Sequence, residues 1–343
     1  ILFIFMGGLV DRWGTKKGYS FSVIWWSLAA IGHAFSKGAL GLSMWRGLLG
    51  LGEAGNFPAA IKSVSEWFPK KDQALAIGLF NSGATISSIV GPPLFAYLVI
   101  HMGWRFCFIV TGALGFIWLI FWMMTPKPPF TQEDEKEPQI SWSEALRHRA
   151  TWGFAVAKFF SDPVWWFYLY WLPPYFFDVR KMDLKEIGWA IPVIYVIAGL
   201  GGVVGGWLSG LMIRRGMERL RARKVGMAIF ALCMPVAACS VLTPSPIWAI
   251  APISLATAAH QGWSSNLYAV TTDSFPKNAV ASVTGIGGCA GGIGGVLFSA
   301  LIPGYVVTNF GYTPVFLVMG IFHLTGLVIS HFLLKEKQIN HAV

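Results

Sequence analysis

Long apolar stretches recur along this chain and constrain its fold more than any other feature. A helix needs about 20 apolar residues to cross the hydrocarbon core of a bilayer. Only 12% of the 343 residues are charged, against about 25% in soluble proteins, and the mean hydropathy is +0.58. We therefore predict an all-α, polytopic membrane protein. A shorter apolar segment at 1–9 precedes ten full spans, at 18–36, 39–61, 74–100, 104–124, 152–176, 186–212, 224–242, 246–270, 280–306 and 313–334.

One long hydrophilic segment, residues 125–150, interrupts this series and is rich in proline and charge. We interpret it as a linker between an N-terminal bundle (1–124) and a C-terminal bundle (151–336), with a tail at 337–343. The chain starts inside an apolar segment, so we expect the first helix and most of the second to be missing. Two halves of six helices each would then favour a pseudo-twofold transporter with its site between the halves.

Positive charge is distributed unevenly among the loops. Alternate loops, counted from the one after residue 9, hold 19 of the 26 Lys and Arg residues, and the others hold five. This asymmetry predicts that the linker and the C-terminus are cytoplasmic. It also explains the net charge of +10 without nucleic acid, because no Lys/Arg-rich helix carries interleaved aromatics for base stacking.

Two charged residues, Arg46 and Glu53, interrupt the span at 39–61. A charge at a helix centre costs about 2.5–3.5 kcal/mol on insertion scales. Seven residues apart, both lie on one helix face, about 10.5 Å apart along the axis. A guanidinium binds a carboxylate bidentately, and a partly desolvated carboxyl can exchange a proton near neutral pH. We predict that Arg46 binds an organic acid and that Glu53 carries a proton; the alternative is a structural intramembrane ion pair.

Polar and aromatic side chains in other spans are further candidates for substrate binding. Asn81, among small residues, could bond a substrate hydroxyl or another helix. Tyr168 and Trp171 share a face and could stack on a sugar ring or pack in the core.

A polar group in the span at 246–270 also suits a cavity lining. His260, Trp263 and Ser264 share a helix face, and Gln261 is adjacent. A lone His260 would be a buried core histidine, but its polar neighbours favour the cavity.

Lys158 and Asp162, one turn apart, predict a structural ion pair near the membrane interface. Pro163 directly after Asp162 predicts a helix break. Glycines crowd the segment 285–295 and predict close helix approach rather than ligand binding. No metal cluster, nucleophile–base pair or cofactor motif is present, which argues against an enzyme and predicts no cofactor. No filter repeat or ring of like charge suggests a channel.

The loop after the first apolar segment reads GGLVDRWGTKK, residues 7–17. Its aspartate can cap a neighbouring helix, and its basic residues suit an anionic leaflet. The spacing resembles the signature loop between helices two and three of the major facilitator superfamily, although an ordinary basic loop is the alternative. The resemblance implies a latch of the outward-open state made by Gly7, Asp11, Arg12 and Gly14. In the corresponding second-half loop Gly210 stands in place of the aspartate.

Longer stretches narrow this resemblance. Residues 46–69, 158–176 and 258–276, together with 81–93, are similar to the anion:cation symporter family and its bacterial hexuronate transporters. The resemblance implies a major facilitator fold of two pseudo-symmetric bundles in a bacterial inner membrane. It also implies proton-coupled symport of a sugar acid such as glucuronate or galacturonate, with Arg46 binding substrate and Glu53 coupling protons. Partners would be the organic anion, protons and lipid, and we expect a monomer. Alternatives are another organic anion (an aldonate, aromatic acid or phosphate ester) or a non-transporting sensor.

Overall fold

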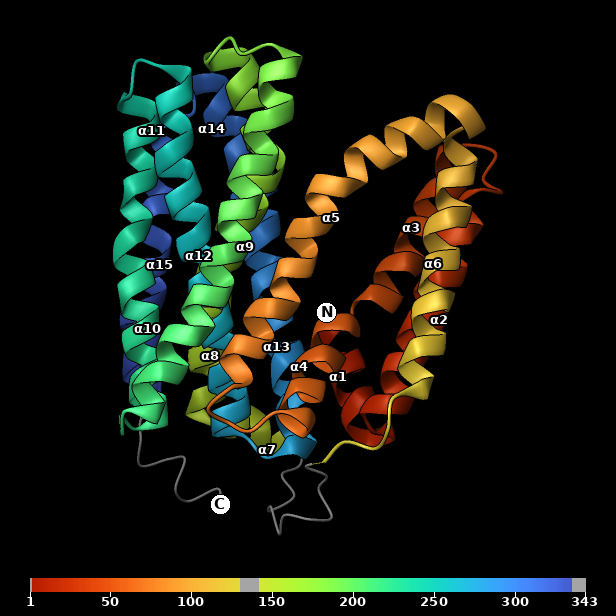
Figure 1. Cartoon of the computed structure of the whole chain (residues 1–343), viewed down its shortest axis with the longest axis vertical. Helices are drawn as coiled ribbons and strands as arrows, with labels where there is room; N and C mark the ends of the chain where they lie inside the picture. Colours follow the sequence, from red (N-terminus) through yellow and green to blue (C-terminus); the bar gives the residue numbers. More distant parts are fainter. Residues whose placement is uncertain (1, 130–141, 335–343) are drawn as a thin grey trace. The chain divides into compact units, whose positions relative to one another are not determined.

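The computed structural model describes residues 2–129 and 142–334, which form helices joined by short loops (Figure 1). No strand occurs in these ranges, and the predicted all-α class is confirmed. Much of the predicted linker, the tail at 337–343 and three lysines behind the predicted orientation (136, 335 and 337) lie outside them. The chain forms two compact units, described separately. Unit 1 comprises residues 1–67, 90–145 and 276–286, and unit 2 comprises 68–89, 146–275 and 287–343.

Unit 1 is organised around α2, which packs against both α3 and α6. Small residues and tryptophans form the core of this contact: Ala29, Ala30 and Leu49 are buried, with Trp26 and Trp45 against them. The helices of unit 1 are α1 (Leu2–Trp13), α2 (Thr15–His33), α3 (Ala39–Glu53), α4 (Asn56–Trp67), α6 (Trp104–Met124), most of α7 (Trp142–Arg147), and parts of α5 (Gln73–Met102) and α13 (Lys277–Gly295).

Unit 2 has its most extensive helix contact between α9 and α12. Glycine allows this approach, because a Cβ on Gly205 would lie 2.4 Å from Gly262 Cα. The α8 helix packs on α15 in the same unit. The main elements of unit 2 are α8 (Arg149–Pro174), η1 (Tyr175–Val179), α9 (Leu184–Arg214), α10 (Arg219–Cys233), η2 (Met234–Ala238), α11 (Cys239–Leu242), α12 (Pro246–Ser274), η3 (Val296–Leu301), α14 (Ile302–Phe310) and α15 (Thr313–Leu333).

The helices follow the predicted spans closely, with several differences. The stretch 7–17, predicted as a loop, is helical except at Gly14, because α1 continues to Trp13 and α2 begins at Thr15. A π segment, Val296–Leu301, interrupts the span at 280–306. A turn at 54–55 divides the span at 39–61 into α3 and α4, and a 3-10 segment, Met234–Ala238, interrupts the one at 224–242. The predicted break at Pro163 is wrong, because α8 continues through it. In the described residues, six helices are long and apolar enough to cross a membrane by length and composition: Gln73–Met102, Trp104–Met124, Leu184–Arg214, Arg219–Leu242, Lys277–Phe310 and Thr313–Leu333.

Two contacts lie beside Pro163, an internal proline of α8. Lys158 Nζ lies 2.7 Å from Asp162 Oδ2, so a side-chain bridge spans the turn before Pro163. Ser299 Oγ donates to the Pro163 carbonyl at 2.7 Å. Pro163 has no N–H to donate to the Phe159 carbonyl, and neither contact is to that oxygen; proline is nevertheless accommodated within membrane helices that pack against neighbouring helices.

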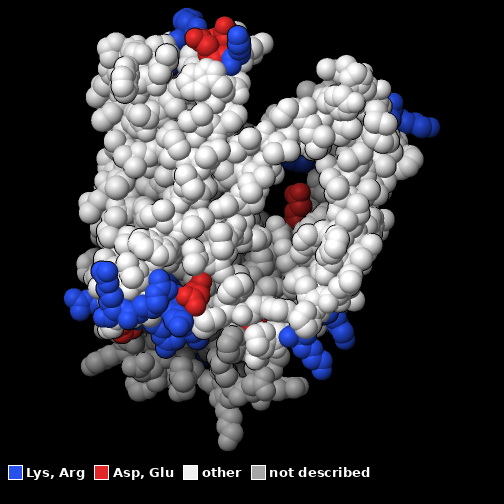
Figure 2. Space-filling view, in the orientation of Figure 1, with Lys and Arg blue, Asp and Glu red and all other residues white. Residues whose placement is uncertain are grey.

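Charged side chains gather at helix ends on the face of each unit that Figure 2 displays, and the helix flanks are nearly free of them. In unit 2 a basic group lies where α9 ends and α10 begins, with Arg214, Arg215, Arg219 and Arg221 all exposed (Figure 2). This distribution is typical of helices whose flanks face lipid.

Candidate functional site

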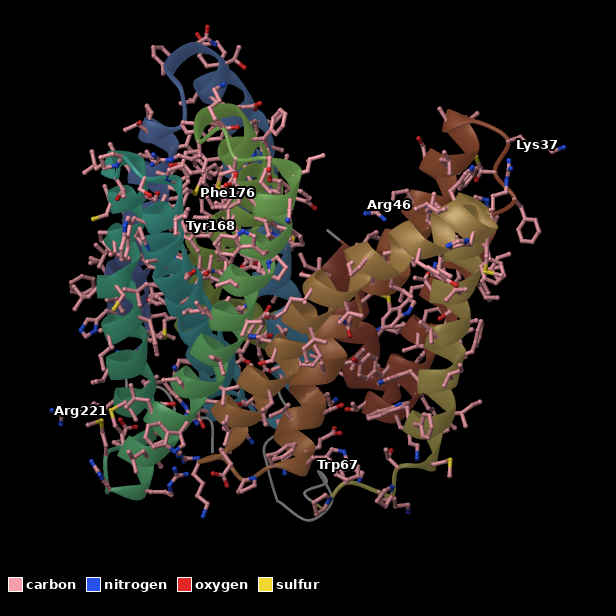
Figure 3. All side chains as sticks on the ribbon, turned by 45° about the horizontal axis from the view of Figure 1, so that its top comes forward. Lys37, Arg46, Trp67, Tyr168, Phe176 and Arg221 are labelled. Carbon is pink, nitrogen blue, oxygen red and sulfur yellow. The ribbon has the colours of Figure 1, made fainter. Side chains whose placement is uncertain are left out.

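Helix α3 of unit 1 presents Arg46 and Glu53 on one exposed face. Figure 3 shows Arg46 projecting from this helix. Gly50 lies between the two on the same face, and nothing stands within 4 Å of where its Cβ would be. Among the described residues neither charged side chain forms a hydrogen bond or an ion pair within 4.0 Å. The face thus offers a guanidinium and a carboxyl separated by an open notch.

His33, which the sequence does not mark as a candidate, lies near Glu53. It is 3% exposed and within electrostatic reach of the Glu53 carboxyl. Its ring stacks on Phe108 with centroids 4.7 Å apart, and Nδ1 lies 2.8 Å from the Ala29 carbonyl oxygen. Nε2 has no partner among the described residues. A lone histidine at the end of an apolar span gives no signal in the sequence that it approaches a carboxyl in another helix.

Asp11, in the last turn of α1, forms a buried ion pair with α4 in unit 1. Lys62 Nζ lies 2.9 Å from Asp11 Oδ1, and the Ser282 backbone N–H donates to Asp11 Oδ2 at 2.7 Å. Burial raises the pKa of Asp11, and the Lys62 ammonium opposes that rise. Lys62 carried no sequence signal beyond its place in a basic loop.

The other residues of the predicted latch have distinct roles in this geometry. A Cβ on Gly7 would lie 2.4 Å from the Ala281 carbonyl oxygen, so only glycine fits there without a shift. Gly14 has φ 81°, which favours glycine, and it separates α1 from α2. Arg12 is exposed. The motif therefore combines two positions that need glycine with one buried carboxylate.

The corresponding region of unit 2 uses another charge pair. Gly210 replaces the motif aspartate, while Arg223 Nε donates to Asp273 Oδ2 at 3.0 Å. Arg223 also donates to Ser209 Oγ and to the Lys70 carbonyl oxygen, both at 2.7 Å. The Arg223 side chain is fully buried. In the sequence Arg223 is only one of several basic residues between two apolar spans.

A histidine–tryptophan cluster occupies the interior of unit 2. His260 Nδ1 and His323 Nε2 are 3.1 Å apart. Trp165 stacks on the His260 ring with centroids 5.4 Å apart, and Trp263 meets the His323 ring at 5.3 Å. Trp263 Nε1 and His323 Nδ1 have no partner among the described residues. The sequence does not single out His323, because 63 residues separate it from His260. It does not single out Trp165 either.

The remaining predicted contacts in unit 2 divide into two groups. Asn81 and Ser264 are brought together, with Asn81 Nδ2 3.4 Å from Ser264 Oγ, and Gln261 is buried on the same helix as Ser264. Tyr168 and Trp171 meet different neighbours: Trp171 Nε1 donates to the Ser299 carbonyl oxygen at 2.8 Å. Tyr168 is fully buried, and its hydroxyl has no partner among the described residues.

A second buried ionic group lies on α8 and α12. The Lys158 ammonium, paired with Asp162, also donates to the Tyr268 hydroxyl at 2.7 Å. A Cβ on Gly291 would lie 2.0 Å from Asp162 Oδ2, so this glycine makes room for the carboxylate. In the described residues no group of three or more His, Cys, Asp or Glu could hold a metal ion.

Apolar helices with charges at their ends, an open charged face and buried polar clusters define an integral membrane protein of the transporter class. The model of the Major Facilitator Superfamily matches residues 1–299. The hexuronate transporter of Escherichia coli (strain K12) is 32% identical over 96% of this chain and 81% of its own length. The galacturonate transporter of Dickeya chrysanthemi is 32% identical over 71% of this chain and 77% of its own.

A solved structure agrees in fold. The fucose:proton symporter of E. coli superposes with a TM-score of 0.75, covering 98% of this chain and 88% of its own, at 16% identity. The chain belongs to the Major Facilitator Superfamily, a family of transporters and not of enzymes. The major facilitator fold implied by the signature loop is confirmed.

Proposed function

We propose that this chain transports a sugar acid of the hexuronate type, together with protons, by alternating access. The observation that carries the proposal is the exposed face of α3, where neither Arg46 nor Glu53 forms an ion pair within 4.0 Å among the described residues. The two relatives named above are described as hexuronate and galacturonate transporters, and both substrates are carboxylates. An aldonate is the nearest alternative substrate.

The side chains of the proposed site divide the work of binding the substrate, coupling the proton and latching the conformation. The Arg46 guanidinium binds the substrate carboxylate, and Glu53 takes up and releases the proton. Substrate hydroxyls and the sugar ring are assigned to side chains of unit 2: Asn81, Tyr168, Trp171, His260, Gln261, Trp263 and Ser264. Asp11, with Gly7, Arg12 and Gly14, serves as the latch.

The arrangement in the membrane is part of the same proposal. The basic ends of the helices face the cytoplasm, which places the linker and the C-terminus there. The halves 1–124 and 151–336 are the bundles that rock, and the transporter acts as a monomer in a bacterial inner membrane.

Arg46→Ala tests the substrate role. A hydrogen bond to a charged group contributes about 1.5–3 kcal/mol, so affinity for glucuronate should fall about 10- to 150-fold. Arg46→Lys keeps the charge but loses bidentate geometry and should fall in between. Binding is measured by titration of the purified protein. Retained affinity in Arg46→Ala would reject the assignment.

Glu53→Gln tests the proton role. Uptake driven by a pH gradient into proteoliposomes should be lost, while counterflow exchange of labelled substrate should persist, because exchange needs no net proton movement. Asp178→Asn, at an exposed carboxylate outside the spans, is the matched control and should change neither. Equal loss of uptake and exchange in Glu53→Gln would argue against proton coupling there.

A further inference from the structure

A groove on unit 2 lies between α10 and α15, at the end where α10 begins and α15 finishes. Its volume is about 600 Å³. Val225 and Ala228 form one wall, and Leu327 and Val328 form the other. Val328 is 57% exposed, so this apolar surface is open and not closed by other described residues. We call it the α10–α15 groove.

Basic groups line the groove only at its helix-end side. Arg221 is exposed and projects away from the helices of unit 2 (Figure 3). Lys224 donates to the carbonyl oxygens of His331 and Leu334, which holds its ammonium at this end of the groove. His331 is exposed beside it. We call the end lined by Arg221, Lys224 and His331 the rim. No Asp or Glu lines the groove among the described residues.

The acidic residue close to Arg221 in the chain, Glu218, is not part of the groove lining. Glu218 accepts the backbone N–H groups of Leu220 and Arg221 and so caps the start of α10. Glu218 keeps its negative charge as a cap, but Arg221 and Lys224 outnumber it, so this end of the groove is net positive. An apolar channel continues from it along the two helices. A ligand that matches both parts has an anionic head and a hydrocarbon chain.

We propose that the α10–α15 groove binds an anionic phospholipid. The phosphate lies against Arg221 and the Lys224 ammonium, and one acyl chain follows the wall of Val225, Ala228 and Val328. Basic sites between membrane helices at the cytoplasmic side recognise anionic headgroups in this way. A free phosphate would use the rim alone and leave the apolar wall exposed, and a zwitterionic lipid would bring a cation to a basic rim. The proposal does not depend on which substrate is transported.

The test is lipid binding to the purified, delipidated full chain in detergent, followed by native mass spectrometry. The probes are dioleoyl phosphatidylglycerol and dioleoyl phosphatidylcholine, which share acyl chains and differ in net charge. Phosphatidylglycerol should bind at least about fivefold more tightly, because each basic residue near an anionic lipid contributes about that factor. Arg221→Gln should weaken phosphatidylglycerol about fivefold and leave phosphatidylcholine unchanged.

Two further variants separate charge from shape. Arg219→Gln removes an exposed charge from the same helix outside the groove and should have no effect. Ala228→Trp places a large side chain in the groove and should weaken the binding of both lipids. Ala228→Leu is the milder version if the tryptophan variant elutes as an aggregate. Equal binding of the two lipids, equal losses in Arg221→Gln and Arg219→Gln, or full competition by inorganic phosphate would each overturn the proposal.

Discussion

The buried pair of Asp11 and Lys62 allows a quantitative test of how α1 is held against α4. Asp11→Asn keeps the size of the side chain and removes its charge, while the Lys62 side chain, 2% exposed, stays buried. Breaking a buried ion pair by removing one partner costs about 3–5 kcal/mol. The lower end applies here, because burial raises the pKa of Asp11 and so already disfavours its charge. In addition, Glu66 also interacts with Lys62, and an asparagine oxygen can still accept the Ser282 N–H.

This loss of stability corresponds to a decrease in the melting temperature, Tm. Unfolding entropy is about 2.1 cal/mol/K per residue, which gives about 0.7 kcal/mol/K for 343 residues. A loss of about 3 kcal/mol therefore lowers Tm by about 4 °C. The assay is thermal unfolding of the purified protein in detergent, with Asp178→Asn as the control for an exposed carboxylate.

A double variant tests whether the unpaired Lys62 charge causes the loss of stability. Asp11→Asn combined with Lys62→Met removes both charges, so no unpaired charge stays buried, and an unpaired buried charge is the main cost of breaking such a pair. Most of the lost Tm should return. If Asp11→Asn melts within about 1 °C of the parent, or the double variant is no better than the single one, the pair does not stabilise the contact of α1 with α4 and the prediction is wrong.

Two other predictions follow from unit 1. Gly7→Ala should lower Tm by about 1–4 °C, since overpacking costs about 1–3 kcal/mol, whereas Gly8→Ala, with nothing within 4 Å of its Cβ, should not; equal shifts would contradict the close approach to Ala281. Burial raises the pKa of Glu66 above its ordinary 4.5, against the opposing hydrogen bond from Thr15. Between the ordinary and the raised value the folded protein binds the proton more tightly than the unfolded chain, so stability falls as pH rises through that window. Glu66→Gln should flatten this dependence in Tm measured between about pH 5 and about pH 7.5, and an unchanged slope would exclude Glu66 as its source.

The sequence alone determined the helices and their order. Whether a stretch can cross a bilayer depends on its own length and apolar content, which are local properties. The same holds for Arg46 and Glu53, whose spacing within one helix sets their common face. The motif glycines were also visible, because Gly7 and Gly14 stand at fixed distances from Asp11.

Only the tertiary structure decided which charged and aromatic groups meet. Lys62 pairs with Asp11 across 51 residues, and His323 meets His260 across 63. A single sequence carries no record of such pairings, since they arise when helices far apart in the chain pack together. The contacts around Pro163 belong here too, because Ser299, 136 residues further along the chain, donates to its carbonyl oxygen. Helix formation in a bilayer is set locally, whereas the partner of a buried polar group is set by packing.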